Sequence, residues 1–393
     1  MQPFQFATAS RIVFGAGRFD EIGKLAAEFG GAALVVSNAD RSGKQGLMQR
    51  LSSLASAASV ASEICWIQGE PEIADVDRSL AAARRLEADL VIGIGGGSAI
   101  DTAKAVAGLL TNGGECLDYM EVIGHGRPIR EAAAPWIAVP TTAGTGAEVT
   151  RNAVIGSRER AYKASIRSPL LLPRVALVDP ELGVRVSPEV TARTGMDALT
   201  QCIESYTSSG ANPLTDALAL EGITRAGRSL ERAWRVGSDL QARQDMALAA
   251  LISGITLTNA GLGAVHGFAA PLGARFPVPH GAVCAVLLPH VMRANVSALR
   301  ETDARHAGLG RYADVGRALV GDPGLAAEDA IETGLQRAGE LVRTLEIPGL
   351  ASFGLGEEAI PGVVEMAQRA SSMKFNPIEL PAAELSSILR EAL

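Results

Sequence analysis

Apolar residues follow two different rhythms along the first half of the chain. Short β-branched and apolar runs, typical of buried strands, occur at Arg11–Phe14, Ala33–Ser37, Leu90–Ile94, Trp136–Val139 and Val175–Val178. Amphipathic patterns with helical spacing lie between several of them, at Arg18–Phe29, Asp75–Glu87 and Ala99–Leu110. Strands that alternate with helices in this way predict a parallel sheet that is covered by helices on both faces.

The strand signals end near the middle of the chain. Before that point, the runs Val154–Gly156 and Ala161–Ile166 flank the charged turn Ser157–Arg160 and predict an antiparallel hairpin added to the sheet. After it, the segment Val186–Glu189 predicts a helix start, with a serine N-cap followed by proline, and helical periods continue to the C-terminus. We therefore predict an α/β domain over residues 1–183 and an all-helical domain over residues 184–393.

One segment of the second half, Met246–Val265, is apolar for long enough to span a bilayer. It carries polar residues such as Ser253, Thr256 and Asn259, and no aromatic or basic belt flanks it. We therefore predict one long helix, buried at the centre of the helical domain and closed by His266, and we expect no membrane partner.

Composition narrows the class of protein. The 393 residues are 47% hydrophobic and 20% charged, which is typical of a well-packed globular protein. The net charge is −7 and no basic block occurs, which argues against a nucleic-acid partner. The four cysteines lie far apart without a CxxC pair, and the N-terminal residues lack the features of a signal peptide. We expect reduced, mostly buried thiols and a cytoplasmic protein.

A run of three glycines joins the strand Leu90–Ile94 to the helical pattern after it. Gly95, Gly96 and Gly97 let a backbone approach a ligand closely, and the amides at a helix start attract an anion such as a pyrophosphate. Ser98 can cap the helix or donate to a phosphate oxygen. A plain strand-to-helix turn is the alternative.

Two further features favour a nucleotide. The strand Trp136–Val139 leads into a loop of hydroxyls and glycines, with Thr141, Thr142 and Thr145, that suits ribose and phosphate, although an ordinary capped turn has the same composition. Asn38 ends another strand, where dinucleotide folds place an acid that holds the ribose hydroxyls. Because a neutral amide stands there, with Asp40 and Arg41 shortly after it, the choice between NAD and NADP stays open.

The helical half carries a candidate metal site. Two of the five histidines, His266 and His280, fall in one unusual passage, and Asp197 and Gln201 lie four residues apart on one predicted helix face. A carboxylate in so apolar a context needs a positive partner, and a divalent ion bound by one carboxylate and two imidazoles meets that need. The alternatives are an aspartate bonded to backbone amides and two core histidines.

At this point the chain resembles a known family, the iron-containing (group III) alcohol dehydrogenases. The resemblance rests on RIVFG at 11–15, GGGSAIDTAK at 95–104, PTTAGTGAEVT at 140–150, GMDALTQCIESY at 195–206, HGFAAPLGARFPVPHG at 266–281 and Asn376-Pro377. It implies a doubly wound, Rossmann-like domain, an all-helical domain, the architecture of dehydroquinate synthase, and an interdomain cleft that holds NAD(P) and a divalent metal, Fe²⁺ or Zn²⁺.

The resemblance also assigns roles to residues. Asp197, His266 and His280 correspond to metal ligands through which catalysis acts. The expected cofactor-binding residues are Asn38, Gly95, Gly96, Gly97, Ser98, Asp101, Thr141, Thr142, Thr145 and Lys163. The expected substrate pocket includes Asn152, Phe268 and Ala270.

The chain departs from the family pattern at two positions. Gln201 stands where the family has a histidine ligand, and Ala270 stands where a second histidine is common. The amide oxygen of Gln201 is a weaker ligand than imidazole, and we include Gln201 in the metal set either as a ligand or as a residue that holds a water. Without a histidine at 270, we expect a metal-bound water or a cofactor hydroxyl to relay the proton.

These features predict a metal-dependent, NAD(P)-linked oxidoreductase that interconverts an alcohol and its aldehyde or ketone, as a homodimer by analogy. Three alternatives stay open: a metal-independent reductase like maleylacetate reductase, an NAD-using lyase like dehydroquinate synthase, and a nucleotide-binding relative whose metal site has decayed.

Overall fold

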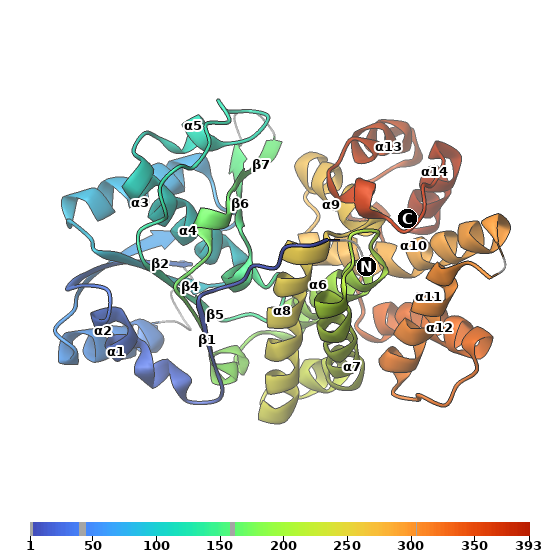
Figure 1. Ribbon diagram of the computed structural model, residues 1–393, viewed down its shortest axis with the longest axis horizontal. Helices are drawn as coiled ribbons and strands as arrows, with labels where there is room; N and C mark the ends of the chain where they lie inside the picture. The colour runs from blue at the N-terminus through green and yellow to red at the C-terminus, as the bar shows by residue number, and fades with distance from the viewer. Residues whose placement is uncertain (1–2, 39–44, 158–161, 304) are drawn as a thin grey trace. The chain divides into compact units, whose positions relative to one another are not determined.

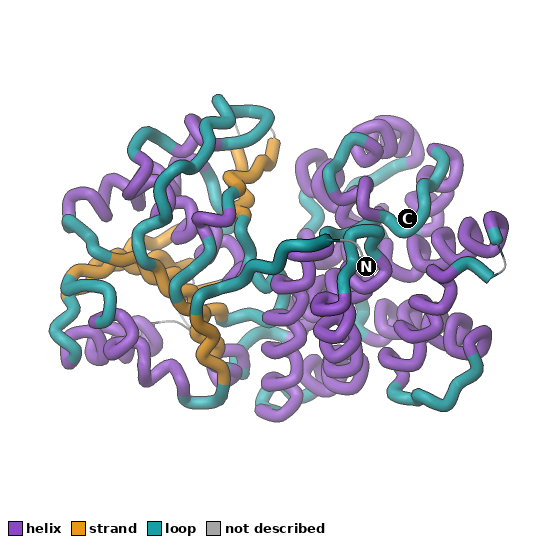
Figure 2. Tube along the Cα trace, viewed as in Figure 1, coloured by secondary structure: helices purple, strands orange, loops and turns teal. Residues whose placement is uncertain are grey.

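The computed structural model describes residues 3–38, 45–157, 162–303 and 305–393. Its backbone forms two compact units. One, the α/β unit, comprises residues 7–142 and 146–185, and the other, the helical unit, comprises residues 1–6, 143–145 and 186–393. Figure 2 shows that the strands lie in the first unit and that helices dominate the second.

The α/β unit is built on a six-stranded parallel sheet with the strand order β1-β8-β5-β4-β2-β3. The strands are β1 (Arg11–Phe14), β2 (Ala32–Asn38), β3 (Ala61–Ile67), β4 (Leu90–Gly95), β5 (Trp136–Pro140) and β8 (Val175–Val178). All five predicted strands are confirmed; β3, most of whose residues are only partly buried, is an addition to them.

Helices cover both faces of this sheet, as predicted (Figure 1). They are α1 (Ile22–Ala27), α2 (Gln45–Ala57), α3 (Ile73–Arg85), α4 (Gly97–Asn112) and the short α5 (Cys116–Tyr119). Successive strand residues point to opposite faces, so Val35 packs with α1 and α2 whereas Leu34 packs with α3 and α4. Apolar residues therefore run continuously through the central strands.

The hairpin forms, but its predicted attachment to the sheet is wrong. Strands β6 (Asn152–Ser157) and β7 (Tyr162–Arg167) pair with each other in a separate two-stranded sheet, and most of the predicted turn lies outside the described residues. Side chains of α4, and not pairing with the six-stranded sheet, hold this hairpin in place. Lys104 Nζ donates to the carbonyl of Asn152, and Asp101 accepts from the backbone N–H of Val154.

The helical unit packs its helices around one large apolar core. The helices are α6 (Pro188–Thr207), α7 (Pro213–Arg235), α8 (Leu240–Ala260), α9 (Ala264–Arg275), α10 (His280–Thr302), α11 (Ala307–Val320), α12 (Ala327–Thr344), α13 (Ile360–Gln368) and α14 (Ala382–Glu391). The predicted start of α6 is confirmed, because Ser187 caps it and Pro188 is its first residue.

The predicted single helix over Met246–Val265 is wrong. The chain breaks after α8 at Gly261, whose φ is +74°, and α9 leaves at 101° to α8. A side chain at Gly261 would strike the ring of Phe375, so the close approach of that ring and the left-handed backbone both require glycine. Consequently His266 lies in the first turn of a new helix and does not close the old one.

Among the described residues, α10 is a helix long and apolar enough to cross a membrane by length and composition. In the fold, 78% of its most apolar window is buried, as in the core helix of a globular domain. The α8–α9 pair passes the same test only as a bent pair.

Candidate functional site

The glycine turn lies where the winding of the α/β sheet reverses. The chain adds β3 on one side of β2 and then places β4 on the other side. Ligands of doubly wound sheets bind at the carboxyl ends of the strands beside such a reversal. Asn38, at the end of β2, and Gly95, at the end of β4, lie at this point, so the fold puts these predicted residues at one edge.

Close contacts explain why the turn needs glycine. Gly95 has a φ of +154°, and a Cβ there would lie 2.2 Å from Asn38 Oδ1. The backbone N–H of Gly96 donates to Asn38 Oδ1 over 3.2 Å, so Asn38 fastens the turn to β2. Gly96 is the N-cap of α4 without a side-chain cap, so Ser98 does not cap the helix. The residues from Gly96 to Ser98 are partly exposed.

The threonine loop begins next to this turn. Thr141 follows β5, and its backbone N–H donates to the carbonyl of Gly95 over 2.8 Å. Thr142 Oγ1 lies 3.4 Å from the Cβ position of Gly96, whereas Thr145 belongs to the helical unit. Thr141 and Thr142 therefore lie beside the glycine turn.

Other predicted cofactor-side residues have partners within the α/β unit. The carboxylate of Asp101 contacts Lys104 Nζ at 3.1 Å and also accepts from the N–H of Val154. On β7, Lys163 forms an ion pair with Glu70 at 3.4 Å. Asn152, at the start of β6, supplies its carbonyl to Lys104. Their binding roles stay predictions.

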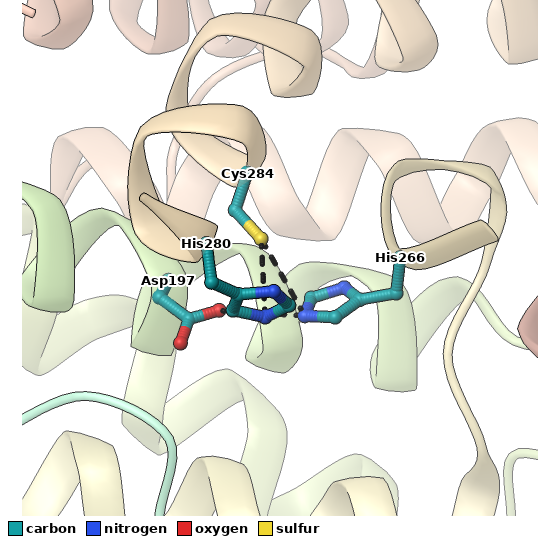
Figure 3. Close-up of side chains that lie close together, drawn as sticks. All are labelled: Asp197, His266, His280 and Cys284. Atoms are coloured by element: carbon teal, nitrogen blue, oxygen red, sulfur yellow. Dashed lines mark hydrogen bonds and ion pairs between the residues drawn. The ribbon is translucent and has the colours of Figure 1, made fainter. Parts of the chain in front are cut away.

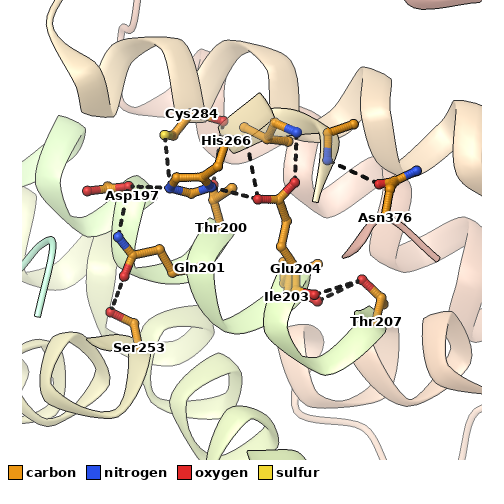
Figure 4. A network of polar contacts seen from close by, with 12 residues as sticks. Asp197, Thr200, Gln201, Ile203, Glu204, Thr207, Ser253, His266, Cys284 and Asn376 are labelled. Carbon is orange, nitrogen blue, oxygen red and sulfur yellow. Dashed lines mark hydrogen bonds and ion pairs between the residues drawn. The ribbon is translucent and has the colours of Figure 1, made fainter. Parts of the chain in front are cut away.

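Helix α6 presents the acidic side of the candidate metal site. Its residues from Gly195 to Thr207 are all buried, including the polar side chains of Asp197, Gln201 and Glu204. Spacings of four and three residues put these three on one helical face. A buried polar face needs partners, and helices α8, α9 and α10 supply them (Figure 4).

The first turn of α9 orients His266. Glu204 Oε1 accepts from the N–H of Val265 over 2.7 Å, and Glu204 Oε2 lies 2.6 Å from His266 Nδ1. Asn376 Oδ1 accepts from the N–H of Ala264 over 3.1 Å. Side chains thus satisfy the open amides of this helix start, and the negative carboxylate lies at the positive end of the helix dipole. With Nδ1 engaged, His266 directs Nε2 toward Asp197.

A glycine makes this contact possible. A Cβ at Gly263 would lie 2.9 Å from both Glu204 Oε1 and Asn376 Oδ1. A larger residue there would push both side chains away from the start of α9.

His280 and Cys284 complete the cluster from the first turns of α10 (Figure 3). His280 Nε2 lies 3.5 Å from Asp197 Oδ1, and His266 Nε2 lies 3.3 Å from the same oxygen. Cys284 Sγ lies 3.6 Å from His266 Nε2 and 3.7 Å from His280 Nε2. One donor atom from each of the four residues lies within 4.8 Å of every other.

Asp197, His266 and Cys284 are buried, and His280 is the partly exposed member of the cluster. Only 3% of the Asp197 side chain and 7% of the His266 side chain are exposed, against 42% for His280. His280 therefore marks the side of the cluster that solvent reaches.

Charges within the cluster compensate for burial. Burial alone would raise the pKa of Asp197, but His280 and His266 outweigh it and lower that pKa. Burial alone would likewise lower the pKa of His266, but Cys284, Asp197 and Glu204 together raise it well above its usual value. Interactions with Cys284 and Asp197 raise the pKa of His280 to about 9. The acidic groups of the cluster thus favour positive charge at both imidazoles, and a divalent cation supplies positive charge at the same place.

These residues fit a divalent metal. Carboxylate oxygen, imidazole nitrogen and thiol sulfur are ligand atoms for zinc, and imidazole and carboxylate also bind Fe²⁺. A ligating histidine commonly gives its second ring nitrogen to a carboxylate, as His266 gives Nδ1 to Glu204. The structure brings Asp197, His266 and His280 together, as their prediction as ligands requires.

Gln201 lies beside this set. Its amide Nε2 is 3.5 Å from Asp197 Oδ1, and its Oε1 accepts from Ser253 Oγ over 2.9 Å. Because an amide nitrogen does not bind metal, this orientation supports Asp197 rather than a cation. If the amide of Gln201 rotated, its oxygen would face Asp197. Ser253 Oγ could then accept from the amide nitrogen while it donates to the carbonyl of Ala250. A ligand role for Gln201 stays a prediction.

The predicted pocket residues on α9 lie in different surroundings. Phe268 is fully buried in the helical core, where its ring contributes to packing, and Ala270 is exposed.

Sequence reasoning missed Cys284 and Glu204. Cys284 is four residues after His280 on one helix, a spacing that puts both on the same face, but a cysteine among valines and alanines has the pattern of a core residue. Glu204 lies seven residues after Asp197, which is about two helical turns. The helical period of α6 could therefore have identified Glu204 as a residue on the same face as Asp197.

A dinucleotide-type sheet edge together with a carboxylate–histidine cluster defines a metal-dependent, nucleotide-linked oxidoreductase. A family model described as iron-containing alcohol dehydrogenase matches residues 9–180, and one for the C-terminal part of the Fe-containing alcohol dehydrogenase family matches residues 191–393. The chain belongs to the iron-containing alcohol dehydrogenase family, as the sequence predicted.

Individual proteins agree with this assignment. Alcohol dehydrogenase 4 of Saccharomyces cerevisiae is 38% identical over 326 residues, which are 83% of this chain and 81% of that protein. The crystal structure of a 1,3-propanediol oxidoreductase matches with a TM-score of 0.92 at 33% identity and covers 100% of both chains. Sulfoacetaldehyde reductase from Bifidobacterium kashiwanohense, solved in complex with NAD⁺, matches with a TM-score of 0.87 at 30% identity, over 100% of this chain and 99% of that one.

The predicted class of function is therefore confirmed. The chain is a metal-dependent alcohol oxidoreductase, and its family binds NAD(P) and iron.

Proposed function

We propose that this chain interconverts a short alcohol or diol and the corresponding aldehyde, using NAD or NADP and a divalent cation, Fe²⁺ or Zn²⁺. The observation that carries the proposal is the convergence of Asp197, His266 and His280 from three helices within reach of one ion. The relatives named for alcohols and for 1,3-propanediol support the substrate class.

The metal set is organised for one charged ion. Asp197 brings the negative charge, and Glu204 holds His266 so that Nε2 faces Asp197. A bound divalent cation supplies Lewis acidity, which polarises a carbonyl oxygen or stabilises an alkoxide. The exposed side of His280 leaves the cluster open to a small substrate.

The nucleotide is proposed to lie at the carboxyl ends of β2, β4 and β5. The amides at the start of α4 suit its pyrophosphate, and Thr141 and Thr142 flank them. Asn38 carries no charge, so this position accepts both NAD and NADP. Asp40 and Arg41, the other residues relevant to this choice, lie outside the described residues.

The remaining histidines are engaged elsewhere, which supports a proton relay through water or a cofactor hydroxyl. His125 contacts Asp118 at 3.2 Å, and His290 contacts Glu391 at 2.9 Å. His306 caps its own helix, α11, by accepting from the N–H of Gly308.

Elemental analysis, chelation and a substrate screen test the proposal together. Purified protein is assayed with short aldehydes and diols against NADH and NADPH, before and after chelation, and as Asp197→Ala. We expect turnover that chelation abolishes and added Fe²⁺ or Zn²⁺ restores, and no metal-supported turnover in the variant.

Other outcomes select the alternatives. Turnover in both the chelated protein and Asp197→Ala, with no metal found, indicates a reductase like maleylacetate reductase. Product formation without net consumption of NAD(P)H indicates a lyase. Nucleotide binding without any turnover indicates a decayed relative.

We also propose a cytoplasmic homodimer. The four cysteines are unpaired, and three of them are buried, which fits a reducing compartment. Light scattering on the purified chain measures its oligomeric state.

A further inference from the structure

Four donor atoms, not three, surround the point between Asp197, His266 and His280 (Figure 3). The fourth is Cys284 Sγ, which comes from the same face of α10 as His280. Cys284 is fully buried, and its sulfur contacts the Nε2 atoms of both histidines. Those are the ring nitrogens that face Asp197, so sulfur and carboxylate oxygen approach the same pair of imidazoles.

Four of the six distances between these atoms are close to the edges of a tetrahedron around zinc. Zinc bonds of about 2.0–2.2 Å to nitrogen and oxygen and about 2.3 Å to sulfur place nitrogen about 3.3–3.5 Å from oxygen and about 3.5–3.6 Å from sulfur. The Asp197 oxygen lies 3.3 and 3.5 Å from the two nitrogens, and the Cys284 sulfur lies 3.6 and 3.7 Å from them. These four distances therefore increase in the order that the bond lengths predict, and the two longer ones are those to sulfur.

Gln201 is the competing source of a fourth ligand. Its only ligating atom, Oε1, accepts a hydrogen bond from Ser253 over 2.9 Å, and its nitrogen faces Asp197. Binding through Gln201 requires that the amide rotate, whereas binding through Cys284 uses the side chain as it stands.

We propose that the Cys284 thiolate is a metal ligand, which gives an Asp-His-His-Cys set that binds Zn²⁺ in preference to Fe²⁺. The inference rests on the metal site of the proposed function and extends it to this chain's own fourth ligand. On binding, sulfur and both Nε2 atoms form bonds to the cation, so the thiol proton of Cys284 and the Nε2 protons of His266 and His280 pass to solvent. A soft thiolate favours zinc, which also stands above iron in the general affinity order of divalent metals.

The fourth donor bears on catalysis as well. Catalytic zinc sites keep one position open or expand to five ligands. Alcohol turnover at a four-donor site therefore requires a further position, and the side of the cluster at His280, which is 42% exposed, is the side that solvent reaches.

The test uses Co²⁺ as a spectroscopic probe in metal-free protein. We expect wild type to bind one Co²⁺ per chain with a thiolate-to-cobalt charge-transfer band in the near ultraviolet. Cys284→Ser should lose that band. The matched control is Cys202→Ser, a buried cysteine on α6 whose sulfur contacts the carbonyl of Ala249 at 3.8 Å, and it should keep the band.

Two measurements make the result independent of how well the variant folds. X-ray absorption of zinc-loaded wild type should show a sulfur neighbour at about 2.3 Å. In competition between Fe²⁺ and Zn²⁺ under anaerobic conditions, wild type should take up zinc preferentially. Outer partners of metal ligands change affinity by about 10–100-fold, so we expect loss of this direct ligand in Cys284→Ser to weaken zinc binding by at least roughly 100-fold.

Wild type that binds no Co²⁺, binds it without the charge-transfer band, or shows no sulfur neighbour overturns the inference. So does a band that persists in Cys284→Ser. The band with no alcohol turnover would contradict the proposed function and leave the ligand assignment standing. Metal-dependent turnover without sulfur ligation would support the proposed function and contradict the assignment of Cys284 as a ligand.

Discussion

The Nδ1 atom of His266 lies 2.6 Å from Oε2 of Glu204, a residue 62 positions earlier in the chain. The contact leaves Nε2 of His266 facing Asp197 and ties the start of α9 to α6. It is the carboxylate–histidine pairing that commonly holds a metal ligand in place.

Glu204→Gln tests this positioning role. The amide keeps the size of the side chain and one acceptor oxygen but loses the negative charge behind His266, so we expect the affinity for zinc to fall by about 10–100-fold. Metal titration of the purified variant measures the change. Glu189→Gln is the control, because Glu189 lies on the same helix with a 67% exposed side chain. Equal affinity in both variants would contradict the role.

Gln201→His tests whether position 201 reaches the cation. Gln201 lies one helical turn from Asp197 and faces it, and imidazole is a better ligand than an amide. We therefore expect Gln201→His to raise the metal content of the protein as isolated, measured by elemental analysis. Gln201→Ala is the companion variant and should leave the metal content unchanged if Cys284 supplies the fourth ligand. Unchanged content in Gln201→His would show that position 201 does not reach the metal.

Asn38→Asp tests the placement of the nucleotide. A carboxylate can still accept the hydrogen bond from Gly96, and it adds a charge that repels a 2′-phosphate. Two charges about 4 Å apart in water interact by about 1 kcal/mol, so kcat/KM for NADPH should fall at least roughly 5-fold relative to NADH. Asn38→Ala, which removes the hydrogen bond without adding charge, should affect both cofactors alike. An unchanged ratio in Asn38→Asp would place the ribose elsewhere.

Glu148 should make stability depend on pH. Burial raises the pKa of this carboxyl group, which is 3% exposed, from 4.5 to about 7. Between these values the folded chain holds a proton that the unfolded chain has released, so the free energy of unfolding falls as pH rises through that window. The shift corresponds to a loss on the order of 3 kcal/mol that is complete above about pH 7.

Glu148→Gln carries no charge at any pH and removes that loss. We expect the Tm of the variant relative to wild type to rise between pH 5 and pH 8, measured by calorimetry. Glu189→Gln, at an exposed site, should show no such trend. A constant difference in Tm across this range would contradict the raised pKa.

Much of the α/β unit could be predicted from local patterns. The limits of β1 and β8 are those predicted, because short β-branched runs between turn residues have few other structures available. The glycine turn was equally clear, since Gly95 satisfies a local requirement of backbone conformation. The two strands of the hairpin were predicted, but their predicted attachment to the sheet was wrong. The hairpin is held by Lys104 and Asp101 of α4, and the local sequence pattern does not specify such contacts.

In the helical unit, residue types and spacing marked Asp197, His266 and His280 as candidates for a metal site, and the resemblance to the family gave them the role of ligands. The structure brings these three side chains together. Folding decided how they are held. The break at Gly261 starts a new helix at His266, Glu204 reaches that helix from α6, and Cys284 enters the cluster through the path of α10. Such contacts join residues far apart in the chain, and helical periodicity specifies which face a side chain occupies but not which helix packs against that face.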